Sequence, residues 1–198
     1  MGRIKGRKPE QTREALLAAA TAAFAEHGFA NATLGLIARR AGVTAATLPY
    51  HFGDKRGLYD TVVDSVYKDL LDFGDTIGTP ATFAEIIESV YTWAELRRDA
   101  IRVMLRSVLD SGGADNRVRK RKMGPALDLI SALLAQRFEV PSEGAREAVI
   151  ALTHLVMRFV TNTREDNRIA FAAADDDQAR DRILGLLVKV GSNLLGVS

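Results

Sequence analysis

The chain of 198 residues contains no cysteine, which excludes disulfide bonds, thiolate metal ligands and cysteine nucleophiles. Its three histidines, His27, His51 and His154, are scattered along the sequence. No histidine-rich metal spacing, glycine-rich phosphate loop or hydrolase nucleophile motif occurs. These absences argue against an enzyme, and we expect no catalytic residues, no metal and no cofactor.

Long apolar runs are also lacking. No run approaches the eighteen or so residues that a membrane-spanning helix needs. The first residues, Met1-Gly2-Arg3-Ile4-Lys5, are not followed by an apolar stretch, so they do not resemble a secretion signal. The sequence is compatible with a reducing cytoplasm, and we expect a cytoplasmic protein without membrane contact.

Helical periodicity, in contrast, is present in nearly every segment, and no convincing alternating strand is found. The pattern predicts an all-α fold of about nine helices. We expect them at about residues 9–27, 33–40, two turns from 44, 55–73, from 79 or 82 onward, 99–110, 115–138, 142–163 and 175–195. The fifth helix could open at Thr79-Pro80 or at a capping box from Thr82, and the seventh could instead begin at Pro125. The segment 164–174 is ambiguous between loop and helix.

Several residues are typical of helix ends. Thr33 and Asp54 are favourable N-caps, and three acids from Asp175 onward open the last helix at the positive end of its dipole. Gly28 is expected to close the first helix in a left-handed conformation, and Gly74 is expected to end the fourth. These signals indicate where the helices begin and end.

Positive charge gathers at the N-terminus. Residues 1–60 carry nine Lys or Arg against five Asp or Glu, a net charge of +4, and Arg3, Lys5, Arg7 and Lys8 all precede the first acid. A basic arm before a small helical unit suits a polyanionic partner. The alternative is a frayed, solvated tail.

Two short helices joined by a tight turn form the most informative stretch, residues 33–52. In the turn Ala41-Gly42-Val43, Gly42 can adopt a positive φ without steric cost, as a sharp bend between helices requires. Ile37, Val43 and Leu48 are spaced so that their side chains meet beneath the turn, between the two helices. We expect Thr44 to cap the second of these helices and to leave its first turn exposed. This geometry presents a helix N-terminus to the major groove of DNA.

This stretch and its surroundings resemble the tetracycline-repressor (TetR) family of bacterial transcriptional regulators, with an AcrR-like N-terminal DNA-binding domain. The resembling positions are Thr12, Arg13, Ala19, Ala20, Phe24, Gly28, Thr33, Ile37, Ala38, Ala41–Thr44, Tyr50–Phe52, Lys55 and Leu58. The resemblance implies a basic arm at 1–9 and a helix-turn-helix domain at 10–70. It also implies a larger helical ligand-binding and dimerisation domain at 75–198.

The resemblance also implies roles for individual residues. Phosphate contacts fall on Thr33, Thr44, Tyr50, His51 and Lys55, while Ala45, Ala46 and Thr47 face base edges. The two alanines cannot form bidentate hydrogen bonds to bases, so we expect thin direct readout and a greater role for DNA shape and the basic arm. Pro49 departs from the family, which often has an aromatic residue there, and we expect the recognition helix to end or tighten at Leu48.

The C-terminal half is compatible with the family's dimer module and inducer pocket. Candidate dimer residues are Leu152, Val156, Leu184, Leu187, Val188 and Leu195. Candidate pocket residues are Trp93, Met104, Met123, His154, Met157 and Phe159, which would suit a largely apolar small molecule. The family mechanism implies a homodimeric repressor that releases palindromic operator DNA when a ligand favours a swung position of the helix at 55–73. Competing interpretations are an architectural DNA-binding protein or a helical interaction module, each without a ligand.

Overall fold

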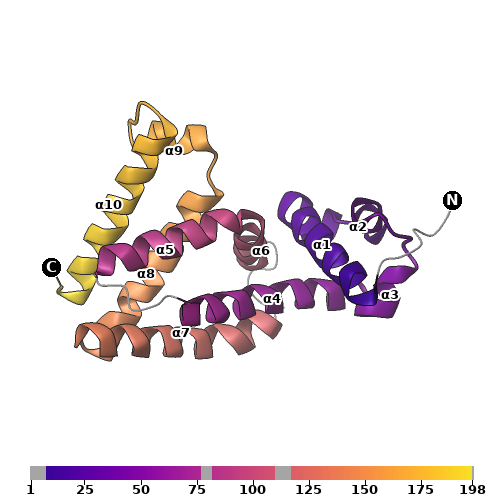
Figure 1. The fold of residues 1–198 in the computed structure, drawn as a ribbon, viewed down its shortest axis with the longest axis horizontal. Coiled ribbons are helices and arrows are strands. Elements are labelled where there is room, and N and C mark those ends of the chain that lie inside the picture. The colour runs from indigo at the N-terminus through magenta and orange to yellow at the C-terminus, as the bar shows by residue number, and fades with distance from the viewer. Residues whose placement is uncertain (1–7, 77–81, 110–116, 198) are drawn as a thin grey trace.

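The computed structural model describes residues 8–76, 82–109 and 117–197, and in these ranges the chain forms ten α-helices and no strand. The all-α prediction is therefore confirmed. The helices are α1 (Pro9–Asn31), α2 (Leu34–Ala41), α3 (Thr47–Phe52), α4 (Lys55–Thr76), α5 (Phe83–Leu96), α6 (Arg98–Leu109), α7 (Arg117–Phe138), α8 (Ser142–Thr161), α9 (Arg164–Ala170) and α10 (Asp176–Leu195) (Figure 1). The helix beyond the expected nine is α9, which forms in the segment whose pattern left helix and loop open.

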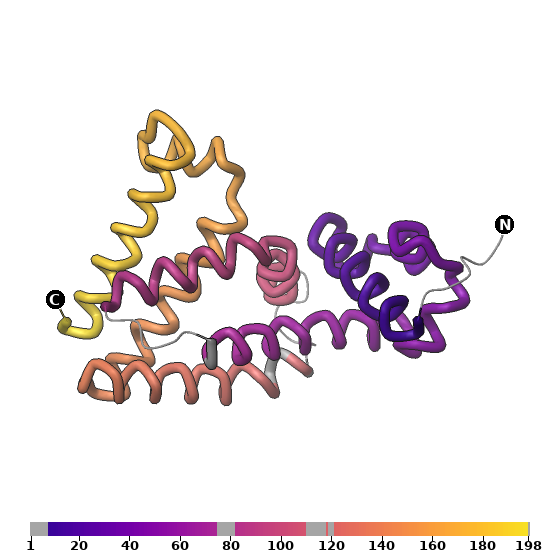
Figure 2. Tube along the Cα trace, in the orientation of Figure 1, coloured from indigo at the N-terminus to yellow at the C-terminus, as the bar shows by residue number. Residues whose placement is uncertain are grey.

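The helices are arranged along an elongated molecule (Figures 1 and 2). At the N-terminal end, α1, α2 and α3 lie with the first half of α4, while α5, α8 and α10 pack together at the other end. Helix α7 runs beside α4, and α6 packs against both α1 and α8. Helix α6 therefore lies between the two ends of the molecule.

Two hydrophobic cores occupy these two ends. The first is centred on Phe24, Ile37, Leu48 and Leu58 and also takes in Val103 of α6. The second is built from residues of α5, α8 and α10, among them Phe83, Tyr91, Leu152, Val160, Ile183 and Leu187. Burial of such side chains contributes about 1.5–3 kcal/mol each. Because α6 supplies part of the first core, the N-terminal helices do not form a core by themselves.

Helix α4 belongs to both cores. Leu58 and Val62 are buried in the first, whereas Leu70 and Phe73 pack against the second. The helix runs to Thr76 without a break, so the expectation that Gly74 ends it is wrong. Gly74 does not take the positive φ that a glycine helix end uses. The expected boundary between residues 70 and 75 falls within this continuous helix.

The expected N-caps are present. Thr33 Oγ1 accepts a hydrogen bond from Leu36 N at 3.2 Å, and Asp54 Oδ1 accepts one from Gly57 N at 2.7 Å. Asp175 Oδ1 accepts one from Gln178 N at 2.8 Å. Thr82 forms a reciprocal capping box with Glu85, so the second of the two proposed starts of the fifth helix is correct. The alternative start at Thr79-Pro80 lies outside the described residues.

Of two other expected helix boundaries, one has a different backbone conformation and one is confirmed. Gly28 has φ 73° and ψ 173°, so its φ is positive as expected, but its ψ is extended and the left-handed conformation expected for a helix end is not adopted. A short turn continues α1 from there to Asn31. Helix α7 passes through Pro125, which confirms the longer alternative over a start at that proline.

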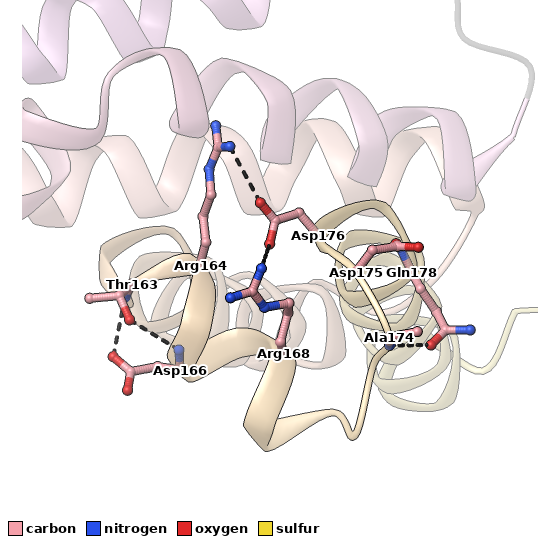
Figure 3. A network of polar contacts seen from close by, with 8 residues as sticks. All are labelled: Thr163, Arg164, Asp166, Arg168, Ala174, Asp175, Asp176 and Gln178. Atoms are coloured by element: carbon pink, nitrogen blue, oxygen red, sulfur yellow. Dashed lines mark hydrogen bonds and ion pairs between the residues drawn. The ribbon is translucent and has the colours of Figure 1, made fainter.

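A polar network fixes the corner where α8, α9 and α10 meet (Figure 3). Thr163 and Asp166 form a capping box at the start of α9. Arg164 and Arg168, one turn apart on α9, both pair with Asp176 at the start of α10, at 3.3 and 3.1 Å. These contacts hold the short helix α9 against the helix that follows it.

Candidate nucleic-acid interface

The turn between α2 and α3 has the geometry that its sequence predicts. Gly42 has φ 71° and ψ 33°, a left-handed conformation that L side chains rarely adopt, and its N–H donates to carbonyls at the end of α2. Ile37 and Leu48 are buried beneath the turn, and Val43 packs against them as part of the first core. Helices α2 and α3 thus pack on the same hydrophobic core.

The start of α3, however, is not where the sequence predicts it. Thr44 is not the N-cap: α3 begins at Thr47, with Ala46 as its N-cap. A tight turn precedes it, in which Thr47 N donates to the carbonyl of Thr44 at 3.0 Å. The hydroxyl groups of Thr44 and Thr47 also lie 3.2 Å apart and form a hydrogen bond.

Pro49 gives the physical reason for this later start. A helix capped at Thr44 would place the proline ring against the carbonyl of Ala45 and remove one intrahelical hydrogen bond. With the helix beginning at Thr47, Pro49 lies in the first turn, where backbone N–H groups have no intrahelical acceptor. The alternative that α3 ends at Leu48 is therefore wrong, whereas the tightening is confirmed, because Leu48 N donates to the carbonyl of Ala45, only three residues earlier, at 3.2 Å. The helix continues to Phe52, and Gly53 N donates to the carbonyl of Pro49 at 3.0 Å.

The outer face of this unit is uncovered. Thr44, Ala45 and Ala46 are exposed, and Tyr50 is 85% exposed. Thr47 and His51 are half-buried. Thr44–Ala46 and Tyr50 are therefore open to solvent, whereas Leu48 of the same helix is buried and anchors α3.

Lys55, the first residue of α4, is engaged within the protein. Its Nζ donates to the carbonyl of Ala30 at 2.9 Å and sits 4.8 Å from the centre of the Phe29 ring. Burial lowers the pKa of Lys55. The guanidinium of Arg56 lies 4.9 Å from the same ring. The first turn of α4 is thus fixed on the end of α1, and Lys55 contributes to that joint as well as to local positive charge.

Three further contacts shape the unit, and none of them was predicted. A Cβ on Gly57 would lie 2.3 Å from the carbonyl oxygen of Phe52, so only glycine lets α4 pass the end of α3 this closely. The guanidinium of Arg13 lies 5.3 Å from the centre of the Phe52 ring. Arg40 donates to Glu26 at 2.6 Å and so ties α2 to α1.

The six candidate pocket residues do not come together. Trp93, Met157 and Phe159 belong to the second core, whereas Met104 packs against the first. Met123 and His154 are exposed. His154 is exposed rather than enclosed in a pocket, and its ring Nδ1 is hydrogen-bonded to the carbonyl of Ile150 on the same helix at 2.8 Å.

The candidate dimer residues are mostly occupied within the single chain. Leu152, Val156, Leu187 and Leu195 are buried in the second core, so they do not face a partner in this conformation. Leu184 and Val188 are half-buried against the same core. The breadth of the apolar arc on α8 and α10 explains why core residues are among the candidates, because periodicity does not distinguish an inner face from an outer one.

An open hollow of about 630 Å³ lies where the end of α4 meets α5. Trp93 and Phe73 stack there with ring centres 5.3 Å apart, and the Arg97 guanidinium lies 4.8 Å from the tryptophan ring. Glu88 adds a carboxylate to the lining. Among the described residues, the buried Nε1 of Trp93 has no hydrogen-bond partner.

Two negative findings concern only the described parts of the chain. None of the helices there is both long and apolar enough to span a membrane. No cluster of three or more histidine, cysteine, aspartate or glutamate side chains is placed there to hold a metal ion.

A three-helix unit with a glycine turn and an exposed third helix defines the helix-turn-helix class of DNA-binding folds. Residues 16–62 match the family model described as bacterial regulatory proteins, tetR family. Within this region the chain is similar to members of the TetR family.

Curated relatives and solved structures agree with this assignment. The chain is 33% identical over 88 residues to the transcriptional regulator SrpR of Pseudomonas putida, covering 44% of this chain and 41% of that protein. It is 42% identical over 60 residues to the regulator BetI 2 of Chromohalobacter salexigens, covering 30% of this chain and 29% of that protein. The aligned regions thus span less than half the length of these two relatives. The structure of a transcriptional regulator, SCO4942 from Streptomyces coelicolor, matches with a TM-score of 0.68 and 22% identity over 94% of this chain and 99% of that chain, which establishes the shared fold.

Proposed function

We propose that this chain is a DNA-binding transcriptional regulator that represses by binding a palindromic operator as a homodimer, and that a small molecule releases it. The observation that carries the proposal is the uncovered surface formed by the turn at Thr44–Ala46 and by Tyr50, with Leu48 anchoring α3 beneath it. As an operator-binding protein it would act in the cytoplasm.

The proposed contacts combine phosphate binding with limited reading of bases. Thr33, Thr44, Tyr50 and His51 would hold phosphates, and the first turn of α4 would add positive charge. Ala45 and Ala46 offer only methyl groups, which pack against thymine methyls or admit the backbone closely. We therefore propose that sequence preference depends largely on DNA shape. The basic arm would assist in the minor groove, although residues 1–7 lie outside the described part of the chain.

A first experiment selects bound genomic fragments with the purified protein and sequences them. A discrete inverted repeat supports a dimeric regulator, whereas little sequence preference favours the architectural alternative. Loss of all salt-sensitive binding to duplex DNA contradicts DNA binding altogether and favours the interaction module.

A matched pair of variants tests the surface itself. Ala46→Glu places a carboxylate beside the proposed phosphate contacts, and we expect binding to weaken by about tenfold or more, because like charges oppose each other there. The same side chain at the start of α3 is favourable for the helix, so folding is not expected to suffer. Ala132→Glu changes an exposed position on α7 in the same way and is expected to leave affinity unchanged.

The proposed homodimer uses the outer sides of α8 and α10. Ile150 on α8 and Leu194 on α10 are each 39% exposed, and the core of the single chain leaves them open. A two-fold dimer would match a palindromic operator. We expect Ile150→Glu to shift the mass measured by light scattering toward the monomer. Ile169→Glu, on the exposed face of α9, serves as the control, and an equal shift for both variants contradicts the proposed face.

Of the six scattered pocket candidates, the proposed effector site keeps one, Trp93. This residue is the only tryptophan in the chain, lines the hollow and keeps a buried N–H unsatisfied. It also stacks on Phe73 of α4, the helix whose other end lies against α3. A ligand that displaces this ring pair would act on α4 directly. Titration of small molecules against tryptophan fluorescence tests this, and an effector that releases DNA without altering the emission contradicts the location.

A further inference from the structure

Helix α6 joins the two ends of the molecule through two arginines one turn apart. Arg102 Nη2 donates to the carbonyl of Thr161, the last residue of α8, at 3.4 Å. Arg106 Nε donates to the carbonyl of Ala25 in α1 at 3.0 Å, and its Nη2 donates to the carbonyl of Glu26 at 3.2 Å. Residues four apart share one side of a helix. One side of α6 therefore binds the end of α8 and the last regular turn of α1.

The contact made by Arg106 is directional. The two carbonyls belong to consecutive residues just before the positive φ at Gly28, where the negative end of the helix dipole attracts a cation. A guanidinium is a planar fork, so binding two carbonyls at once fixes orientation as well as distance. A displacement of α6 along or around its axis would therefore move the last turn of α1.

Glu26 continues this connection toward α3. Its backbone carbonyl accepts a hydrogen bond from Arg106, and its carboxylate accepts one from Arg40 of α2 at 2.6 Å. His27 Nε2 lies 3.3 Å from the same carboxylate. Arg40 stands two residues before Gly42, the bend from which the polypeptide enters α3. Backbone and side chain of one residue thus join α6 to the helix-turn-helix.

We propose that Arg106 is a positioning residue that couples the C-terminal helices to α3 through Glu26 and Arg40, separately from the continuous helix α4. This inference rests on the DNA-binding function proposed above. Its consequence is that the orientation of α3 depends on α6 as well as on α4, so a rearrangement of the second core reaches the DNA-binding surface by two connections.

A double-mutant cycle tests the coupling by DNA affinity. Arg106→Gln and Glu26→Ala are each expected to weaken binding to the selected operator by about fivefold, and the double variant is expected to bind about as well as either single variant, because both changes break one connection. Arg98→Gln, at the start of the same helix and outside this connection, is the control and is expected to stay within about twofold of the unchanged protein. Additive losses in the cycle, or an equal loss in the control, overturn the proposal.

Hydrogen exchange gives a second measurement that does not depend on DNA. Arg106→Gln is expected to speed exchange of the amides from Gly42 to Leu48, and Arg98→Gln is not. If Arg106→Gln fails to fold, Arg106→Lys keeps the charge without the fork and is expected to show the same faster exchange to a smaller degree. Unchanged exchange in both Arg106 variants overturns the coupling. If the unchanged protein binds no duplex, the proposed DNA-binding function fails, and the exchange result alone decides the coupling.

Discussion

Replacement of Gly57 by alanine tests the joint between α3 and α4. The new Cβ would lie 2.3 Å from the backbone oxygen of Phe52, whereas real Cβ contacts essentially never fall below 3.0 Å. One helix must therefore move by about 0.7 Å. The obstacle is backbone rather than a flexible side chain, so the strain cannot be relieved by a rotamer change.

The expected magnitude follows from two opposing effects. Overpacking of this kind costs about 1–3 kcal/mol. Replacing glycine by alanine inside a helix contributes about 1 kcal/mol of stability. Gly74→Ala, in the same helix, isolates the second effect, since nothing lies within 4 Å of a Cβ built there. We expect Gly57→Ala to be less stable than Gly74→Ala by about 1–3 kcal/mol.

Thermal unfolding at a fixed protein concentration measures this difference. For a chain of this length, each kcal/mol corresponds to about 2–4 °C in Tm. Gly57→Ala should therefore melt roughly 2–12 °C below Gly74→Ala. The same displacement should weaken DNA binding in Gly57→Ala alone. Equal melting temperatures for the two variants would refute the close approach of α4 to the end of α3.

Three further predictions concern stability. Gly191→Ala should unfold at lower urea than Gly185→Ala, because its Cβ would lie 2.4 Å from the Phe83 ring whereas that of Gly185 meets open space, and equal midpoints would contradict this crossing of α10 and α5. Burial raises the pKa of Tyr91 to about 12 from 10.0. Since the unfolded chain loses this proton first, stability should fall between pH 10 and 12 by up to about 1.4 kcal/mol per pH unit, and Tyr91→Phe should flatten that decline in urea titrations. Thr82→Ala should cost about 1 kcal/mol through loss of the capping box, and an unchanged midpoint would argue against it.

Much of the fold is local enough to be predicted from the sequence. Thr33, Asp54 and Asp175 cap helices because their side-chain oxygens reach backbone N–H groups three residues ahead. Gly42 marks the sharp turn because other residues avoid its φ. These signals depend on neighbours within a few positions, so a single sequence contains them in full.

The features that escaped prediction depend on distant parts of the chain. Arg106 and Ala25 are 81 residues apart. The sequence around an arginine on an amphipathic helix does not indicate whether its side chain binds another helix or faces solvent. Leu152 and Leu187 lie in apolar arcs too broad for periodicity to separate core from interface. For the same reason, periodicity does not reveal that His154 is exposed. Tertiary packing decides these cases.

The altered start of α3 changes what the DNA-binding surface offers to a base pair. Because Pro49 moves the first helical residue to Thr47, Ala45 and Ala46 present methyl groups and backbone from a tight turn. The hydroxyl of Thr47 is engaged with Thr44, which leaves Tyr50 as the most exposed polar side chain on this helix. A surface with so few free donors discriminates bases weakly by hydrogen bonding. Under the proposed function, selectivity would come from how well the spacing of two such turns in a homodimer matches the shape of the duplex. The position of α3 would then matter more than its side chains.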